Sequence, residues 1–454
     1  MARGDKKKKR AKPEAGTKSK KKSSKRAAVT RVVLVEAAKK KGAAVSPLAP
    51  LTFPELPPVS GVRFATAAAG IKSLGRDDVM LAACDPGTVV AGVFTRSSTR
   101  SAPVRDCETK LAALDGPGAG LAFVVNSGNA NAFTGKAGDG TVKKVCKAAA
   151  KALKIKAGRV FTASTGVIGE PLPPEKITEV IAAMSAGLDE NGAKAAARAI
   201  MTTDTFAKGA AVQGKIGGKP VRLVGIAKGS GMIAPDMATM LSFLFTDAAL
   251  TPPVAQQLLG AAMARSFNAI TVDGDTSTSD TVMLAATARA GNAPIADARS
   301  KAGRAFSVML EAVAQDLALQ IVRDGEGATK LVEIRVINAR NDTDADKVAR
   351  SIANSPLVKT AIAGEDPNWG RVVMAVGKSG AEADRDTLSI RFGDILVAEN
   401  GWRAKSYDEA DGAAYMRGDE LVLTVDLGLG KGAATVWTCD MTHGYISINA
   451  DYRS

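Results

Sequence analysis

Hydrophobic and polar positions along the chain follow two different periods, which predict two kinds of element. Short apolar runs, several of them alternating with polar residues, predict β-strands. These runs lie at 121–125, 221–226, 241–245, 331–337, 421–425 and 434–437. Because an alternating run places its apolar side chains on one face, we expect most of these strands to bury one side against a core.

Apolar residues spaced three and four positions apart predict helices in other parts of the chain. One such pattern covers 142–153, and another follows a Pro-Pro pair at 173–174. Two longer helices are expected at about 253–267 and 298–322. Strands and helices are mixed without a strict βαβ repeat, so the sequence favours an α+β fold with a mixed sheet over a doubly wound fold.

The formal charge of +15 is concentrated at the N-terminus. The first 42 residues hold 17 Lys/Arg against three Asp/Glu, which leaves about +1 for the rest of the chain. This basic segment has too few apolar residues to offset the entropy of folding. We therefore interpret residues 1–45 as a disordered, solvated tail, in preference to a nucleic-acid arm or a targeting peptide, and residues 46–60 as a Pro-rich linker before a body that starts near Gly61.

Several classes of protein and of site are disfavoured by the composition. The chain has no uninterrupted apolar run of about 18 residues and no secretory-type apolar segment near its start, so we expect a soluble, cytoplasmic protein. Its four cysteines form no C-x-x-C pair, which argues against a zinc site or a disulfide framework. His443 is the only histidine, so a Ser-His-Asp or Cys-His site would have to use it.

The most informative segment for chemistry is residues 228–241, which read KGSGMIAPDMATML. Small and flexible residues lead directly into Thr239, which precedes a predicted strand. Without a spare histidine, a hydroxyl nucleophile needs another base, and a threonine at a new N-terminus carries one in its own α-amine. Cleavage between Ala238 and Thr239 would supply that amine, by attack of the Thr239 hydroxyl on the Ala238 carbonyl and hydrolysis of the resulting ester. Taken alone, however, a Gly-rich loop before a strand is more often only a turn.

This segment resembles the self-cleavage signature of the ornithine acetyltransferase family, the glutamate N-acetyltransferases of arginine biosynthesis. Seven further blocks resemble the family in the same order along the chain, from about Gly61 to the last residue. They are NSGNAN at 126–131, STGVIG at 164–169, MTTDT at 201–205, DGDTST at 273–278, DGEGATK at 324–330, EDPNWGR at 365–371 and INADYRS at 448–454.

The resemblance implies roles for individual residues. It makes Thr239 the nucleophile, and Thr165 with Gly166 the oxyanion hole that holds the charge developing on the attacked carbonyl. It places the substrate contacts at Thr202, Lys228, Thr239, Glu326, Asn449 and Ser454. In this interpretation Lys228 faces the substrate α-carboxylate and Glu326 the cationic ornithine side chain. Without the resemblance, 164–169 reads as a plain turn, and Lys228 and Glu326 as surface charges.

The chain departs from the family pattern in a few places. Ser454 stands where many members end in threonine, and the block FTRSS at 94–98 differs from the family's usual sequence. His443 lies between strand-like segments, where a structural role is favoured over that of a general base. Trp369 reads first as part of a packed corner and second as part of a site.

By resemblance, the fold is a two-layer α+β arrangement of sheet and helices, divided into an α chain, 61–238, and a β chain, 239–454, that form one catalytic unit in an α2β2 heterotetramer. The reaction expected is acetyl transfer from N2-acetyl-ornithine to glutamate through acetyl-Thr239, without metal or cofactor; use of acetyl-CoA as a second donor stays open. A self-processing aminopeptidase would share the nucleophile but not the KGSGM and INADYRS blocks. A nucleic-acid-binding protein would bind through the basic tail.

Overall fold

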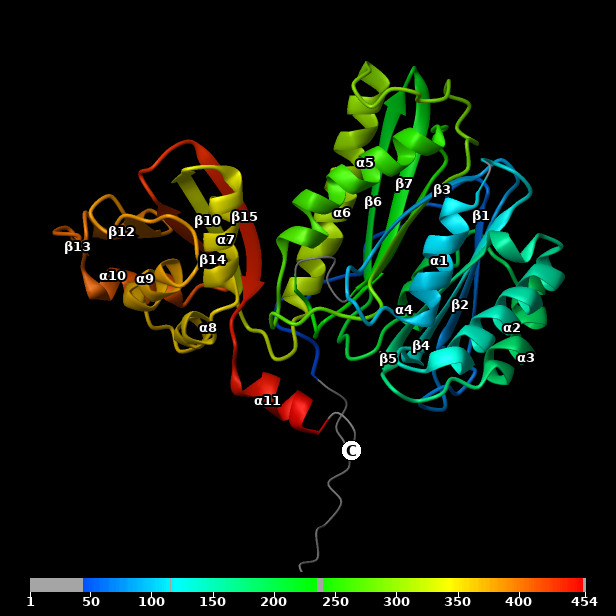
Figure 1. The fold of residues 1–454 in the computed structure, drawn as a ribbon, viewed down its shortest axis with the longest axis horizontal. Helices are drawn as coiled ribbons and strands as arrows, with labels where there is room; N and C mark the ends of the chain where they lie inside the picture. Colours follow the sequence, from blue (N-terminus) through cyan, green and yellow to red (C-terminus); the bar gives the residue numbers. More distant parts are fainter. Residues whose placement is uncertain (1–43, 115, 235–239, 452–454) are drawn as a thin grey trace, which may run out of the picture. The chain divides into compact units, whose positions relative to one another are not determined.

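The computed structural model describes residues 44–114, 116–234 and 240–451 (Figure 1). The predicted cleavage site at Ala238 and Thr239, the C-terminal Ser454 and residues 1–43 of the basic tail lie outside the described residues. Residues 44–60 form no helix or strand, and they pack on the body. For example, the Ser46 N–H donates to Thr205 Oγ1 at 2.9 Å, and Val59 is only 4% exposed.

Two mixed sheets form most of the region before residue 300. In the four-stranded sheet the order is β1-β2-β4-β5; its first three strands are antiparallel, whereas β4 and β5 are parallel. In the five-stranded sheet the order is β3-β9-β8-β7-β6, with only β8 and β9 parallel. The strands of the first sheet are β1 (Val62–Ala67), β2 (Val79–Cys84), β4 (Leu121–Asn129) and β5 (Val160–Val167). Those of the second are β3 (Val89–Phe94), β6 (Lys208–Ile216), β7 (Lys219–Lys228), β8 (Leu241–Thr246) and β9 (Thr281–Ala286).

The two sheets pack face to face through an aromatic core. Phe123 of β4 lies 5.6 Å from Phe243 of β8 between ring centroids, and Phe64 of β1 meets Phe245 of β8 edge to face at 5.0 Å. Edge-to-face and tilted contacts of this kind add to the stabilisation that burial of the rings provides. One continuous apolar cluster therefore joins strands of both sheets.

Helices cover the outer face of each sheet, on opposite sides of the molecule's sheet pair in Figure 1. The helices α2 (Gly135–Leu153) and α3 (Pro174–Ala186) pack on β2 and β4, and α5 (Pro252–Arg265) and α6 (Lys301–Arg323) pack on the five-stranded sheet. This part of the chain thus has four layers, and the expected two-layer arrangement is wrong here. The reason is that β2, β8 and β9 are buried at every position, so both faces of each sheet need a cover.

The long helix α6 is a core element. Among the described residues it is the one helix whose length and apolar composition would also suit a membrane span. Its apolar side chains, however, belong to the buried cluster that it shares with α5 and the five-stranded sheet. The shorter elements of this region are α1 (Ala102–Ala112), α4 (Ala193–Ala199) and two 3₁₀ turns at Ala157–Arg159 and Phe267–Ala269.

The C-terminal region is built on a six-stranded mixed sheet in the order β13-β12-β11-β14-β10-β15. Its strands β10 and β14 alternate between buried and more exposed positions, because helices cover only one face. Here the two-layer arrangement holds. The strands are β10 (Leu331–Ala339), β11 (Ser389–Phe392), β12 (Ile395–Glu399), β13 (Trp402–Arg403), β14 (Glu420–Asp426) and β15 (Gly432–Cys439). The helices are α7 (Asp342–Ala353), α8 (Pro356–Ala363), α9 (Trp369–Gly377), α10 (Glu409–Met416) and α11 (His443–Ala450).

The predicted α+β class with mixed sheets is confirmed. Each of the six predicted strands lies within an observed strand, and each of the four predicted helices overlaps an observed helix, with shifts at the ends. Two local features differ from what the sequence pattern alone suggests. His443, expected between two strand-like segments, begins helix α11, and residues 164–167, which without the resemblance would read as a turn, continue strand β5. Trp369, read as part of a packed corner, starts α9 and packs against the C-terminal core.

Candidate active site

One cavity of about 240 Å³ collects every sequence-predicted site residue that the structure describes. Thr165, Gly166, Thr202, Lys228, Glu326 and Asn449 all line it, although they are spread over 285 positions of the sequence. The elements that bring them together are strands β5 and β7, two loops and the C-terminal helix α11. The remaining lining residues are Ala130, Val167, Ile168, Thr203, Gly231, Met232, Ser277, Thr278 and Ser279.

Thr165 and Gly166 reach the cavity at the end of β5. Gly166 pairs with Gly128 of β4 and has a φ of +131°, which favours glycine. A Cβ at position 166 would lie only 2.3 Å from the Gly128 carbonyl carbon. The close approach of Gly128 and Gly166 therefore lets β5 end within the STGVIG block with its backbone open to the cavity.

Lys228 ends β7 and points its ammonium group at Thr165. The Lys228 Nζ donates to Thr165 Oγ1 at 3.2 Å, and the lysine is only 3% exposed. Because an ammonium group has no acceptor, the Thr165 oxygen must accept this bond, which leaves the Thr165 hydroxyl hydrogen available to a ligand. Burial lowers the pKa of Lys228 below its ordinary value, although the negative charge of Asp204 acts in the opposite direction.

A buried ionic network holds the loop that carries Thr202. Lys208 Nζ bridges Asp204 Oδ1 at 2.7 Å and Asp324 Oδ2 at 2.5 Å, and all three side chains are fully buried. Asp204 also accepts the backbone N–H of Thr202 at 2.9 Å and of Gly229 at 2.7 Å. The network therefore fixes two of the loops that line the cavity.

The charges in this network shift one another's pKa values. Burial alone would disfavour the ionised carboxylate of Asp204, but Lys208 and Lys228 hold its pKa below the ordinary value. Burial would also lower the pKa of Lys208, whereas the two carboxylates raise it. Burial raises the pKa of Asp324, and the charge of Asp204 adds to this rise, despite the bond to Lys208. The network is thus stable as a unit only while Lys208 carries its charge.

Glu326 and Asn449 form a polar pair on another wall of the cavity. Asn449 Nδ2 donates to Glu326 Oε2 at 2.7 Å, and the Glu326 N–H donates to the Ser230 carbonyl at 3.0 Å. Gly231 makes room for the glutamate, because a Cβ there would lie 2.4 Å from the Glu326 carboxyl. The Glu326 carboxylate is thereby presented close to backbone, where it can face a cationic group.

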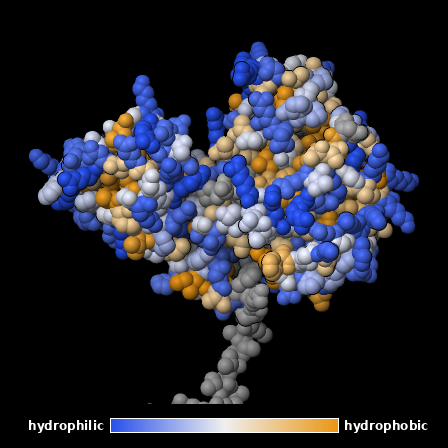
Figure 2. Space-filling view, viewed as in Figure 1, coloured by the Kyte–Doolittle hydropathy of each residue, from blue (hydrophilic) through white to orange (hydrophobic). Residues whose placement is uncertain are grey.

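Helix α11 brings Asn449 to the cavity mainly through polar contacts. Thr442 caps the helix by accepting the Gly444 N–H at 3.0 Å, and its hydroxyl donates to the Gly327 carbonyl at 2.6 Å. Tyr445 donates to Asp273 Oδ2 at 3.3 Å. The helix has no fully buried residue; Ile446 is 66% exposed, and hydrophobic surface gathers over this helix in Figure 2. His443 is exposed and does not line the cavity.

The strand that follows Thr239 in sequence is anchored at its first residues. Met240 donates its N–H to Asp280 Oδ1 at 3.0 Å, and its carbonyl accepts the Thr281 N–H at 3.1 Å. Burial raises the pKa of Asp280 well above its ordinary value, and Oδ2 has no hydrogen-bond partner among the described residues. The start of β8 is therefore anchored by a carboxyl group whose ionisation burial disfavours.

Sequence reasoning did not assign roles to several residues that shape the cavity. Asp204, Asp324 and the 277–279 stretch all lie in or directly after blocks that carry the family resemblance, which was the available signal. Lys208 and Asp280 lie outside the resembling blocks and gave no such signal. The described residues hold no group of three or more His, Cys, Asp or Glu side chains arranged to bind a metal.

Residues 63–454 match the family model described as the ArgJ family. A relative from Ruegeria pomeroyi, named "Arginine biosynthesis bifunctional protein ArgJ", is 62% identical over 90% of this chain and 98% of its own. A crystal structure of the argJ protein from Bacillus halodurans is 42% identical, with a TM-score of 0.46, over 47% of this chain and 100% of that one. Ornithine acetyltransferase from Mycobacterium tuberculosis, crystallised with ornithine, is 35% identical, with a TM-score of 0.33, over 39% of this chain and 92% of that one.

Proposed function

The chain belongs to the ArgJ family, and we propose that it is the arginine-biosynthesis enzyme that transfers the acetyl group of N2-acetyl-ornithine to glutamate. The observation that carries this proposal is the convergence of six family-type residues on one cavity. They lie on both sides of the predicted cleavage site, so both products of cleavage would contribute to the same site.

The first half of the reaction forms an acetyl ester on Thr239. After cleavage, the α-amine of Thr239 takes the proton from its hydroxyl as the oxygen attacks the acetyl carbonyl of N2-acetyl-ornithine. The negative charge on the carbonyl oxygen is held by the Thr165 hydroxyl and the Gly166 N–H. The tetrahedral intermediate then collapses, the C–N bond breaks, and the ornithine amine leaves with a proton from the ammonium group.

The second half returns the enzyme to its free form. The amine of glutamate attacks the ester carbonyl, the same donors hold the oxyanion, and Thr239 leaves as an alcohol while N-acetylglutamate is released. Lys228 fixes the Thr165 hydroxyl so that its hydrogen faces the oxyanion, and its charge suits a substrate α-carboxylate. Glu326 suits the ornithine ammonium, with Thr202, Asn449 and Ser454 completing the contacts. Acetyl-CoA would serve as an additional acetyl donor.

The proposed assembly is an α2β2 heterotetramer of chains 61–238 and 239–454 in the cytoplasm. The two chains of one catalytic unit share the five-stranded sheet, since β3, β6 and β7 precede the cleavage site and β8 and β9 follow it. The antiparallel pairing of β7 with β8 runs through the middle of that sheet. Such a sheet supports association of the chains after the backbone is cut.

The test compares wild-type protein with Thr239→Ala by denaturing gel, intact mass and N-terminal sequencing. Wild type should give two chains, one beginning Thr-Met-Leu, whereas Thr239→Ala should stay intact. Wild type incubated with N2-acetyl-ornithine should gain one acetyl group on the smaller chain and lose it when glutamate is added. Thr178→Ala, on the surface of α3, is the control and should behave as wild type. An uncut wild-type chain, or hydrolysis of amino-acid amides without acetyl transfer, would refute the proposal.

A further inference from the structure

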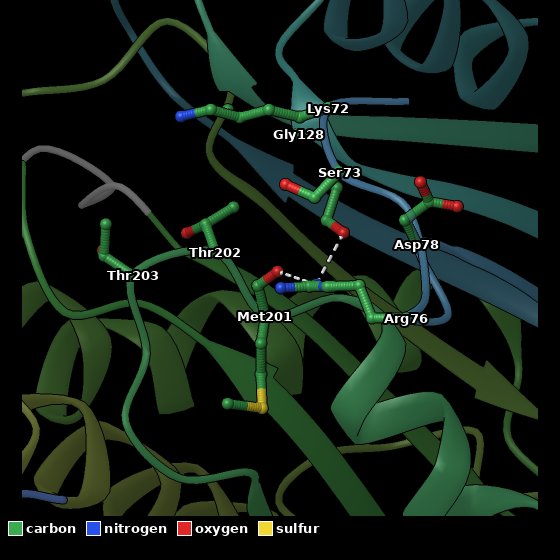
Figure 3. Close-up of a pocket in the computed structure, with 10 residues that line it drawn as sticks. Lys72, Ser73, Arg76, Asp78, Gly128, Met201, Thr202 and Thr203 are labelled. Carbon is green, nitrogen blue, oxygen red and sulfur yellow. Dashed lines mark hydrogen bonds between the residues drawn. The ribbon is translucent and has the colours of Figure 1, made fainter. Parts of the chain in front are cut away.

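A second cavity of about 150 Å³ adjoins the candidate active site, and two of its ten lining residues are basic. It shares Gly166, Thr202 and Thr203 with the first cavity, so the two open onto the same stretch of β5 and the same loop. Its remaining lining residues are Lys72, Ser73, Arg76, Asp78, Ser127, Gly128 and Met201 (Figure 3). None of these seven has a place in the acetyl-transfer steps described above.

Arg76 lies along the cavity with its guanidinium group directed at the loop that leads to Thr202 (Figure 3). It donates to Ser127 Oγ at 3.0 Å, to the Met201 carbonyl and, through Nε, to the Asp77 carbonyl at 3.4 Å, all of which are neutral oxygens. A guanidinium group has five N–H donors, so these bonds leave others for a ligand. The positive charge of Arg76 is therefore held in place without a carboxylate partner among the described residues.

The one acidic residue of this cavity is already committed to its backbone. Asp78 is 3% exposed, and its two oxygens accept the N–H groups of Ala69 at 2.7 Å and Ile71 at 2.6 Å. These bonds shape the turn that carries Lys72 and Arg76. The carboxylate thus organises the loop, and two of the three other side chains that this loop presents to the cavity are basic.

The two amino acids that react at the Thr239 ester have side chains of opposite charge, and this cavity would accommodate the second of them. The first product, ornithine, has a cationic side chain, and Glu326 faces it in the first cavity. The acceptor, glutamate, has an anionic side chain, and contact with the Glu326 carboxylate would repel it. Both amino acids must nevertheless place their α-amine at the same ester carbonyl, next to Gly166. The glutamate side chain must therefore extend from that point into a different cavity, one with a cationic side chain.

We propose that the cavity between Arg76, Lys72 and Thr202 is the subsite for the side-chain carboxylate of the acceptor, and that Arg76 is the residue that selects glutamate. This inference rests on the proposed acetyl transfer. A planar guanidinium already fixed by three hydrogen bonds is suited to bind a carboxylate, because little further side-chain freedom is lost on binding. The donor and the acceptor would then share the oxyanion hole and differ in the cavity that takes the side chain.

The experiment measures acetyl transfer from the acetyl-enzyme to two different acceptors. It uses the cleaved forms of wild type, Arg76→Gln and Arg76→Lys. The first acceptor is glutamate, and the second is isotope-labelled ornithine, whose exchange into N2-acetyl-ornithine needs no anionic subsite. For Arg76→Gln we expect kcat/KM for glutamate to fall about 10- to 100-fold, the range for loss of a hydrogen bond to a charged group. Ornithine exchange should stay within about twofold of wild type, and Arg76→Lys should recover part of the glutamate activity.

Each alternative outcome has its own signature. Equal loss with both acceptors in Arg76→Gln would assign Arg76 a structural role and overturn the proposal. A defect confined to acetyl-CoA as donor would mean that the cavity binds phosphate groups, which also overturns it. If wild type forms no acetyl-enzyme at all, the proposed function has failed independently of the subsite. Arg385→Ala, an exposed arginine paired with Asp386 in the C-terminal region, is the matched control.

Discussion

At the scale of single residues, the site depends on side chains whose charge is controlled by burial. Lys228 is the clearest case, since it is buried between Thr165 and the carboxylate of Asp204. A buried ammonium group keeps a low pKa unless its partners compensate for lost hydration. Glycines at 166 and 231 contribute at the same scale, because a side chain at either would displace Gly128 backbone or the Glu326 carboxyl.

The lowered pKa of Lys228 predicts the alkaline side of the enzyme's pH profile. In the proposed mechanism Lys228 binds the substrate carboxylate only when protonated, so kcat/KM for N2-acetyl-ornithine should fall as pH rises through a pKa below the ordinary lysine value of about 10.4. The acidic side should follow the α-amine of Thr239, which must be neutral to act as base and titrates near 8 in unperturbed form. Steady-state kinetics from pH 6 to 10.5 on cleaved protein measure both limbs.

The matched variant is Lys228→Gln, which keeps a donor for Thr165 but has no charge to lose. It should show lower kcat/KM, by about 10- to 100-fold, without the alkaline decline. An alkaline limb of unchanged position in Lys228→Gln would assign that limb to another group and contradict the prediction. Lys143→Gln, which replaces an exposed lysine of α2 outside both cavities, serves as the control for loss of a lysine.

The sequence singled out candidate site residues but not the contacts that hold them. Thr165, Lys228, Glu326 and Asn449 were reached through resembling blocks, and the structure places them around one cavity. Their supports were missed for a physical reason. Asp204 and Lys208 are four positions apart, as in a helical ion pair, yet they lie in a loop and a strand. Asp324, which completes the network, is 116 positions away from Lys208, and no local sequence pattern predicts such a contact.

At the scale of elements, local periodicity was a good guide to helices and strands but a poor guide to layers. Fully buried strands such as β8 have no polar face to alternate, so their sequence does not reveal that helices and a second sheet cover both sides. Strand ends were also hidden. In β5 the glycine at 166 looked like a turn signal, whereas pairing with β4 keeps the chain extended.

Helix α11 is the element on which we expect the site to be most easily perturbed. It carries Asn449 but buries no side chain completely, so polar contacts by Thr442 and Tyr445 hold it. Thr442→Val removes the cap and the bond to Gly327, and loss of a cap costs about 0.5–2 kcal/mol of helix stability. Because this cost is local, KM for N2-acetyl-ornithine should rise several-fold while the thermal midpoint of the whole protein changes little.

Hydrogen exchange resolves the local effect of Thr442→Val. Amides of 443–450 should exchange faster in the variant, whereas those of β8 should be unchanged. Ser447→Ala is the control, since Ser447 lies on the same helix and, among the described residues, its hydroxyl donates only to the His443 carbonyl one turn earlier. Uniformly faster exchange across the molecule would show that α11 supports the global fold, contrary to the prediction.

At the scale of the whole molecule, one buried network connects the sheet, the core helix and the site. Lys208 lies on β6, Asp324 follows the last turn of α6, and Asp204 holds the loop of Thr202. Stability and site geometry are therefore coupled through three side chains that solvent does not reach. A buried ion pair often adds little net stability compared with apolar residues, but removal of one partner leaves an uncompensated charge.

Lys208→Met should accordingly destabilise the protein more than any surface lysine substitution. Two carboxylates would lose their shared cation, at a cost of about 3–5 kcal/mol, and the backbone around Thr202 and Gly229 would lose the ionised acceptor that positions it. The urea midpoint should fall well below that of Lys215→Met, which replaces an exposed lysine of the same strand. In Asp324→Asn combined with Lys208→Met, one of the stranded charges is gone, so part of the lost stability should return. If Lys208→Met and Lys215→Met unfold at the same urea concentration, the carboxylates must be protonated in the folded protein, and the network would be a set of neutral hydrogen bonds with no role for charge.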